Sequence, residues 1–167
     1  MNVRSARVKD AGGIAGVHVR TWQSAYPGIV PDAYLRALSI DARTASWQAN
    51  LTAASPEVWV AEKHAEVVGW IAFGKSRDAD ASADTGEVEA LYVLPAYWST
   101  GVGRTLWEKA YLRLQARGFR RATLWVLADN ARAIRFYSAA GFAPSLERAI
   151  EIGGKSLLEV RYEVPIG

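Results

Sequence analysis

The chain has no cysteine, one methionine and two histidines among its 167 residues. Without thiols it forms no disulfide and has no thiolate metal ligand or cysteine nucleophile. His18 and His64 have no partner at metal-ligand spacing, so we expect no metal site. No apolar run approaches the ~18 residues that cross a bilayer, and residues 1–9 lack the apolar core of a signal peptide. We therefore expect a cytoplasmic protein that does not contact a membrane.

The sequence also has no segment in which charged residues of one sign form a dense run. The 20 Lys and Arg residues and the 17 Asp and Glu residues are scattered along the chain and leave a net charge of +3. With no basic tract, a nucleic-acid partner is not indicated. Half of the residues are hydrophobic and seven are tryptophans, which is enough for a sizeable core with a large aromatic component. The length fits one domain, residues 1–167.

Residue periodicity predicts a mixed α/β (α+β) fold. Segment 87–127 reads as strand, helix and strand, a unit that brings its two strands parallel. The Asp- and Ala-rich segment 75–86 is interpreted as a mobile loop. The expected strands are 3–8, 57–62, 67–74, 87–94, 121–127, 144–152 and 155–164, and the expected helices are 10–25, a stretch from 31, 41–51, 101–116 and 130–140.

A glycine-bearing turn joins the 87–94 strand to the following helix. Such a turn directs free backbone N–H groups and the positive end of the helix dipole at one point, where an anion binds. Gly101 and Gly103 permit a close approach, and Arg104 and the Ser99 and Thr100 hydroxyls add contacts. A purely structural role for the two glycines is an equal alternative on this segment alone. The turn lacks the Gly-Lys-Ser/Thr of a P-loop, which counts against a nucleotide-binding module.

Two motifs in order make the chain resemble the GNAT superfamily of acyl-CoA-dependent N-acyltransferases. The run from Trp98 to Gly103 is similar to that superfamily's Gln/Arg-x-x-Gly-x-Gly/Ala turn, although Trp98 replaces Gln or Arg and Ser99 stands where glycine is frequent. About 30 residues later, the run from Leu124 to Phe142 resembles its strand, Asn, short helix, Phe-Tyr and Gly-Phe ending. The resemblance implies a central mixed, mostly antiparallel sheet that is splayed between the 87–94 and 121–127 strands and flanked by helices.

The resemblance further implies acetyl-CoA as cosubstrate. Its pantetheine arm would lie in the splay and pair with the backbone of residues 91–93, so that the Val93 N–H faces the thioester oxygen. The pyrophosphate would sit on residues 99–104, and Asn130 would hold a pantetheine amide or simply cap its helix. The cofactor-binding residues that the resemblance implies are Leu91, Tyr92, Val93, Ser99, Thr100, Gly101, Val102, Gly103, Arg104, Asn130, Arg132, Phe136 and Tyr137.

Tyr137 is the candidate general acid that protonates the departing thiolate. The alternative is that Tyr137 is a structural residue whose hydroxyl makes a hydrogen bond within the protein. Strand alternation puts Glu87 and Glu89 on the face of Leu91 and Val93, so either could take the amine proton, with Glu87 preferred. The alternative is that both carboxylates are merely solvated side chains of the strand and that a chain of water molecules removes the amine proton.

The acceptor is expected to be an amine of a small molecule, protein or peptide. Trp22 and Tyr26 would wall its pocket, with Tyr34 nearby, and Glu87 and Glu89 would attract its charge. A non-catalytic acyl-CoA sensor of the same fold is the main alternative function. Dimers are common among similar proteins, so a homodimer is possible.

Overall fold

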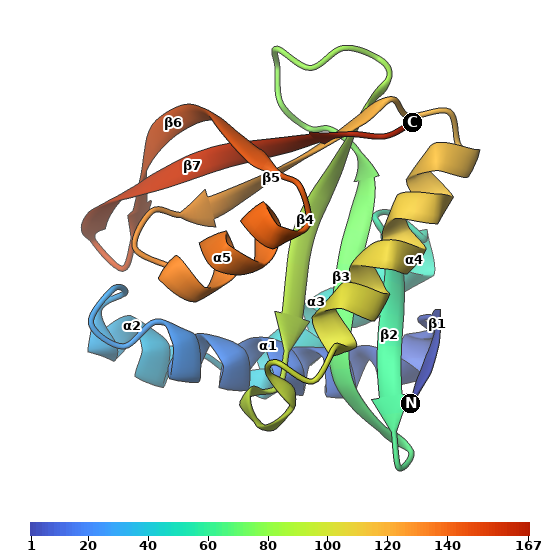
Figure 1. Cartoon of the computed structure of the whole chain (residues 1–167). Coiled ribbons are helices and arrows are strands. Elements are labelled where there is room, and N and C mark those ends of the chain that lie inside the picture. Colours follow the sequence, from blue (N-terminus) through green and yellow to red (C-terminus); the bar gives the residue numbers. More distant parts are fainter.

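The computed structural model describes all residues from Met1 to Gly167. The helices and strands alternate along the chain much as their periodicity predicts (Figure 1). Their bounds are β1 (Asn2–Ser5), η1 (Val8–Asp10), α1 (Ala11–Ala25), α2 (Asp32–Ala37), α3 (Ile40–Ala53), β2 (Glu57–Lys63), β3 (Glu66–Lys75), β4 (Thr85–Val93), η2 (Pro95–Tyr97), α4 (Val102–Ala116), β5 (Arg121–Leu127), α5 (Ala131–Ala139), β6 (Ala143–Ile152) and β7 (Lys155–Pro165).

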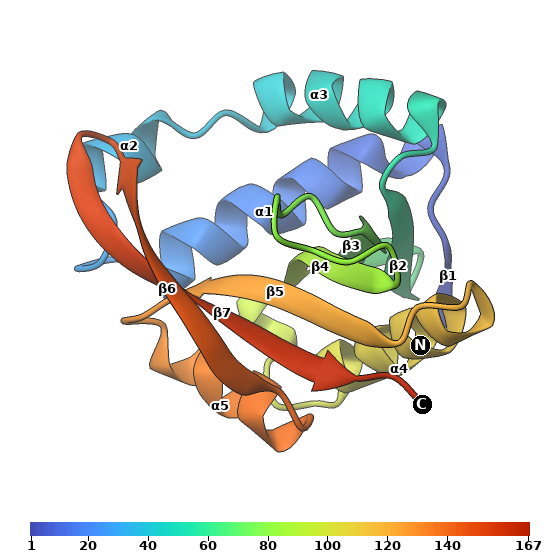
Figure 2. The ribbon, with the colours of Figure 1, turned by 90° about the horizontal axis from the view of Figure 1, so that it is seen from above.

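One mixed sheet of seven strands runs through the molecule in the order β1-β2-β3-β4-β5-β7-β6. Only β4 and β5 are parallel, and they pair solely where Thr85–Glu87 meets Arg121–Thr123. Beyond that point the two strands separate, as Figures 1 and 2 show. The α/β fold and the splay between β4 and β5 are therefore confirmed.

Helices cover both faces of the sheet (Figure 2). On one face, α4 buries Val102, Leu106, Ala110 and Leu114, the residues whose spacing of four predicts an amphipathic helix, in a cluster with α5 side chains and the sheet. On the other face, α1 and α3 pack Ile14 and Trp47 against Trp70. The Trp70 indole N–H donates to the Ile14 carbonyl at 3.0 Å and ties α1 to the sheet.

Two sequence expectations need correction. The first strand ends at Ser5, not at residue 8, because residues 8–10 turn into a 3₁₀ helix. The loop expected over 75–86 is shorter, since β3 continues to Lys75 and β4 begins at Thr85. Arg161 pairs with Asp78 and Asp80 of this loop and so anchors it to β7.

No helix is long and apolar enough to cross a bilayer.

Candidate functional site

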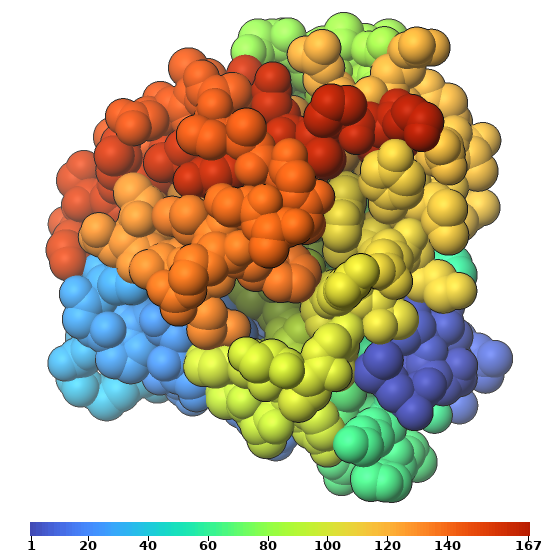
Figure 3. All heavy atoms as spheres, in the orientation of Figure 1, coloured from blue at the N-terminus to red at the C-terminus, as the bar shows by residue number.

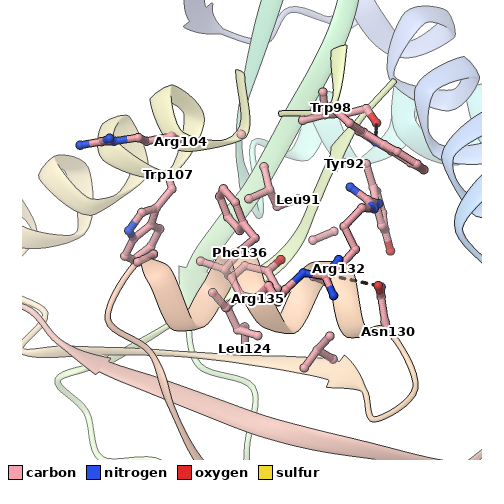
Figure 4. A pocket seen from close by; sticks show the side chains of 18 of the residues that line it. Leu91, Tyr92, Trp98, Arg104, Trp107, Leu124, Asn130, Arg132, Arg135 and Phe136 are labelled. Atoms are coloured by element: carbon pink, nitrogen blue, oxygen red, sulfur yellow. Dashed lines mark hydrogen bonds between the residues drawn. The ribbon is translucent and has the colours of Figure 1, made fainter. Parts of the chain in front are cut away.

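A large cavity lies in the splay between β4 and β5 and has a volume of about 890 Å³. We call it the larger cleft. Its walls are β4 from residue 88 onward, the connection and first turns of α4 from residue 97 to 108, and β5 with α5 from residue 124 to 140. The end of α1 and its C-cap Tyr26 also line it. Figure 3 shows the hollow between α5 and the segment before α4, and Figure 4 shows the side chains that line it.

One wall of the larger cleft is an unpaired strand edge. Beyond Glu87, β4 pairs with β3 on one side only, because β5 has already turned away. Leu91, Tyr92 and Val93 all line the cleft there. A free strand edge offers a row of backbone N–H and C=O groups to an extended ligand with amide bonds.

The N-terminus of α4 forms a second wall. Its first N–H groups, on residues 102–104, have no acceptor within the helix, and no side chain caps them. Gly101 precedes the helix with φ of +90°, a conformation that disfavours other residues. A Cβ on Gly103 would lie only 3.3 Å from the Phe136 ring of α5. Backbone conformation therefore explains the glycine at position 101, and close packing explains the glycine at position 103. The N-terminus of α4 is open to an anion.

The side chains of this turn contribute unequally. Ser99 lines the cleft, with φ of +60° in the region that favours glycine. Arg104 also lines it and pairs with Glu108 at 2.9 Å. The Thr100 hydroxyl instead donates to the Tyr97 carbonyl at 2.6 Å, and the Val102 side chain is buried in the core. The donor of the Thr100 hydroxyl is therefore used within the turn, and Val102 offers only its backbone to a ligand.

Trp98, the residue that departs from the superfamily motif, makes a specific set of contacts. Its indole N–H donates to the Val93 carbonyl at 2.7 Å. The Arg132 guanidinium lies over the indole ring, 3.4 Å from its centroid (Figure 4). This cation–π contact joins the segment before α4 to α5 across the larger cleft. Sequence reasoning named Arg132 but treated Trp98 only as a mismatch.

Helix α5 and its N-cap present four predicted residues to the larger cleft: Asn130, Arg132, Phe136 and Tyr137. Asn130 precedes the helix, and its side-chain oxygen accepts from the Ala133 N–H at 3.2 Å, so the predicted capping role is confirmed. Phe136 packs on Gly103. The Tyr137 ring contacts Phe136 and Phe142, and its hydroxyl has no hydrogen-bond partner in the chain. The alternative of a satisfied structural hydroxyl does not hold for Tyr137.

Three phenols, of Tyr26, Tyr92 and Tyr137, line the larger cleft close to one another. Burial is the main cause that raises the pKa of each above its ordinary value, and the neighbouring phenols raise the pKa of Tyr26 and Tyr137 further. All three therefore keep their protons at neutral pH and act as hydrogen-bond donors.

The two strand carboxylates do not share a face with Leu91 and Val93, and here the alternation argument was wrong. Ala72 pairs with Ala90 while Phe73 pairs with Val88, so Glu89 is the extra residue of a β-bulge. A bulge shifts the alternation by one residue. Val88 therefore joins Leu91 and Val93 in the core beneath α4 and α5.

The bulge gives Glu87 and Glu89 different surroundings. Glu87 is 2 % exposed and lies outside the larger cleft; its carboxylate accepts from the Arg77 Nε–H at 2.8 Å and from the Arg77 backbone N–H at 3.2 Å. Glu89 is 21 % exposed, lines the larger cleft and reaches Arg77 only at 3.5 Å. Desolvation is the largest influence on Glu89 and raises its pKa. Glu89 is therefore a weakly paired carboxylate in the larger cleft, and Glu87 is a buried carboxylate paired with Arg77.

A second cavity of about 220 Å³ adjoins the larger cleft, and we call it the smaller pocket. Glu89, Tyr26 and Tyr92 line both cavities. Trp22 lines the smaller pocket as predicted, whereas Tyr34 lines neither cavity and packs on Gly153. The remaining lining residues are Arg77, Glu87, Val88, Trp125, Leu127, Arg148, Ile150, Ile152 and Glu159.

Of these residues only Glu87 was predicted from the sequence; those with polar or aromatic side chains that were missed are Arg77, Trp125, Arg148 and Glu159. Arg77 stands in the segment interpreted as a mobile loop, and Arg148 in the closing hairpin. The alternation of Arg148, Ile150 and Ile152 was a signal that these side chains share one face. Nothing in the sequence indicated that this face meets β4.

His18 lies outside both cavities. It is 8 % exposed and stacks on Tyr92, and neither ring nitrogen has a hydrogen-bond partner. Desolvation, reinforced by Arg43, lowers its pKa to about 4, so the imidazole is neutral. No group of three His, Asp or Glu side chains is placed to hold a metal ion.

Comparisons with known proteins agree with this geometry. Residues 18–142 match the model of the Acetyltransferase (GNAT) family. The chain is 33 % identical over 161 residues to the uncharacterised N-acetyltransferase YuaI of Bacillus subtilis (strain 168), an alignment that covers 96 % of this chain and 90 % of that protein.

Among solved structures, the fold is similar to that of yncA, a putative acetyltransferase from Salmonella typhimurium solved with its cofactor acetyl-CoA. The TM-score is 0.76 at 24 % identity, over 100 % of this chain and 94 % of that one. An N-acetyltransferase from Staphylococcus aureus Mu50 also has a TM-score of 0.76, at 20 % identity, over 99 % of this chain and 98 % of that one. Since the family model spans most of the chain and a relative above 30 % identity spans nearly all of it, the chain belongs to the Acetyltransferase (GNAT) family and is an N-acetyltransferase.

Proposed function

We propose that the chain transfers the acetyl group of acetyl-CoA directly to a primary amine, with Glu89 as general base and Tyr137 as the donor to the leaving sulfur. The observation that carries this proposal is the convergence of four features in one cleft: the open β4 edge, the uncapped N-terminus of α4, the unpaired Tyr137 hydroxyl and the half-buried Glu89 carboxylate. Each of them meets one requirement of acyl transfer.

The residues present fit an acyl-CoA. The cleft volume of about 890 Å³ lies within the ~300–1,000 Å³ usual for sites of large ligands. The N–H groups of residues 102–104 would hold the pyrophosphate, with Ser99 and Arg104 beside it. The unpaired edge at residues 91–93 would pair with the pantetheine amides, and Asn130 would bind one of them at its free side-chain NH₂. Acetyl-CoA, when bound there, supplies an acyl group activated as a thioester.

The chain's own groups move the protons. The lone pair of the neutral acceptor amine forms the new C–N bond as the C–S bond breaks, and the Glu89 carboxylate accepts the proton that this nitrogen then loses; exchange with solvent afterwards returns that proton. A backbone N–H of residues 91–93 donates to the carbonyl oxygen as negative charge develops on it. The Tyr137 hydroxyl, protonated at neutral pH, donates to the departing sulfur. Glu87 positions Arg77, and Arg77 in turn faces Glu89.

Calorimetry and a thiol assay test the proposal together. Because the chain has no cysteine, a thiol reagent reports only released coenzyme A. We expect acetyl-CoA to bind and an amine panel to release coenzyme A. Gly101→Val should abolish binding, since its φ of +90° excludes a β-branched residue. Gly118→Val, at a similar φ of +83° just past the other end of α4 and outside both cavities, is the matched control for strain alone. Unchanged affinity in Gly101→Val would overturn the assignment of the α4 end.

The assay also separates the alternative, an acyl-CoA sensor of the same fold. A sensor binds acetyl-CoA but releases no thiol with any amine. The Glu89 carboxylate and the Tyr137 hydroxyl facing the same cleft favour the enzyme.

A further inference from the structure

Arg148 places a positively charged guanidinium in the smaller pocket, and some of its N–H groups have no hydrogen-bond partner. We infer that the acceptor is a small amine that also carries a carboxylate, an amino-acid-type molecule, and that Arg148 binds this carboxylate while Glu89 receives the amine. The inference rests on the proposed function, because it assumes that the acceptor reaches Glu89 through this pocket.

Two contacts hold the Arg148 side chain in place, and a third fixes one of its partners. It projects from β6, directly opposite Glu159 on β7, and its Nε–H donates to the Glu159 carboxylate. Its guanidinium lies over the Trp125 ring, 3.7 Å from the centroid. Trp125 is itself held, because its indole N–H donates to Asp78 at 3.0 Å. Little side-chain entropy is therefore lost when Arg148 binds a ligand.

The terminal nitrogens of Arg148, Nη1 and Nη2, have no hydrogen-bond partner in the chain. The side chain is nearly half exposed and lines the smaller pocket. Two parallel N–H groups on a planar guanidinium match the two oxygens of a carboxylate. Exposure explains why these donors are tolerated without a partner, and their orientation by Trp125 and Glu159 makes them a specific site.

The other charged side chains of the smaller pocket are already paired. Arg148 and Glu89 are therefore the positive and the negative group that remain available to a ligand. Arg77 is occupied by Glu87 through Nε and Nη2, and by Glu89 through Nη1 at 3.5 Å. Glu159 is occupied by Arg148. The long Arg77–Glu89 contact makes Glu89 the carboxylate with the weakest pairing. A molecule with an ammonium and a carboxylate complements both groups at once.

The size and position of the pocket favour a small acceptor. Its volume of about 220 Å³ is below the ~300 Å³ at which sites for drug-sized ligands begin. The β6–β7 hairpin that carries Arg148 extends to α2 (Figure 2), where Lys155 donates to the Ile29 carbonyl at 3.0 Å. A peptide amine would place a neutral amide, not a carboxylate, beside Arg148.

The experiment compares matched amines in the thiol-release assay. Alanine, leucine, methionine and phenylalanine are each tested against the corresponding decarboxylated amine and the corresponding amide, and kcat/KM is corrected for the unprotonated fraction of each amine. We expect at least one amino acid to exceed its own decarboxylated amine and amide by about 10- to 100-fold, the range of a charge-assisted bidentate contact.

Variants of Arg148 complete the test. Arg148→Gln should remove the preference by lowering kcat/KM for the amino acid only, and Arg148→Lys should restore part of it. Arg121→Gln is the control, because Arg121 is an exposed arginine at the far end of β5 without an ion pair. The unfolding temperature of each variant confirms that it folds, and calorimetry of the amino acid with the protein–coenzyme A complex measures binding without turnover.

The outcomes separate the two proposals. Equal efficiency for the amino acids and their decarboxylated amines, or equal loss for both in Arg148→Gln, would overturn the amino-acid inference and leave acetyl transfer standing. Turnover confined to peptides or polyamines would do the same. No thiol release with any amine would overturn the proposed function, and the inference with it.

Discussion

The bulge at Glu89 gives the two carboxylates of β4 different surroundings, and the proposed mechanism depends on that difference. One inserted residue turns Glu87 into a buried partner of Arg77 and leaves Glu89 at the border of the two cavities. A general base must be within reach of the amine and must be ionised but not fully neutralised by a cation. Glu89 satisfies these conditions, whereas Glu87 does not.

We predict that Glu89→Gln lowers kcat/KM by about 10²- to 10⁴-fold and removes the acidic limb of its pH profile. In the wild-type protein this limb should have its midpoint above the ordinary range of glutamate, because burial raises the pKa of Glu89. Activity then rises with pH as Glu89 loses its proton. The profile of kcat/KM from pH 5 to 9 measures this. Glu87→Gln should keep the limb but shift it, since it frees Arg77 to pair with Glu89. A limb that survives unchanged in Glu89→Gln would exclude it as the base.

We predict that Tyr137→Phe lowers kcat more than it weakens acetyl-CoA binding. The ring contacts with Phe136 and Phe142 remain, so only the hydroxyl donor is lost. Loss of one donor to a developing charge costs about 10²-fold or more. Steady-state kinetics beside calorimetric affinity separate the two effects. Equal turnover in Tyr137→Phe would remove this residue from the mechanism.

His18 predicts a pH dependence of stability. Its pKa in the folded protein is about 4, below the ordinary value of 6.5, so the unfolded chain binds the proton more readily. Stability is therefore fully present above pH ~6.5 and is lost as the pH falls toward 4, by about 3 kcal/mol in total. Denaturant unfolding at pH 7.5 and pH 4.5 measures the change. In His18→Phe the difference between the two pH values should shrink by most of that amount; an unchanged difference would assign the loss to other groups.

At the scale of elements, the two walls of the larger cleft are joined by a contact that the superfamily motif does not contain. Trp98 precedes α4 and Arg132 belongs to α5, and their cation–π contact spans the space between them. The same indole also binds the Val93 carbonyl at the end of β4. Trp98 therefore connects three of the elements that form the proposed cofactor site.

We predict that Trp98→Leu speeds coenzyme A dissociation by about 2- to 30-fold, equivalent to the ~0.5–2 kcal/mol of a cation–π contact. Arg132→Gln should have a similar effect, because both variants break the same contact. Stopped-flow displacement of coenzyme A gives the rates. The double variant should dissociate no faster than the faster single variant, which a double-mutant cycle tests. Additive effects would show that the two side chains act independently.

At the scale of the whole molecule, the sheet lacks β4–β5 pairing beyond Glu87, and a cofactor bound as proposed would take the place of that pairing. The ligand would contact both halves of the sheet, so its binding free energy should appear as stability of the entire chain. This links the local geometry of the splay to global unfolding.

We predict that acetyl-CoA at 100 times its Kd raises the unfolding temperature by about 5–11 °C. Mass action gives about 2.7 kcal/mol at this concentration, and each kcal/mol is worth about 2–4 °C for a chain of this size. Thermal unfolding with and without ligand measures the shift, and ATP at the same concentration serves as control. An equal shift with ATP would favour a nucleotide-binding module instead.

Sequence alone determined the features that depend on local chemistry. Alternation, helical spacing and turn residues predicted the elements to within a few residues, since these signals reside in neighbouring side chains. The glycines at 101 and 103, the cap at Asn130 and the aromatic residue at 137 were predictable because each is required within a single motif. The motif order also predicted the splay between β4 and β5.

Only the tertiary structure decided what depends on residues distant in sequence. The bulge at Glu89 arises from the register of β4 against β3, and no pattern within β4 announces it. The contacts of Trp98 with Arg132, and of Arg148 with Trp125 and Glu159, join elements that the chain brings together only on folding. Local sequence therefore predicted where the cofactor would bind. The choice of base and the charges that face the acceptor come from packing between elements, which a single sequence does not encode in any one segment.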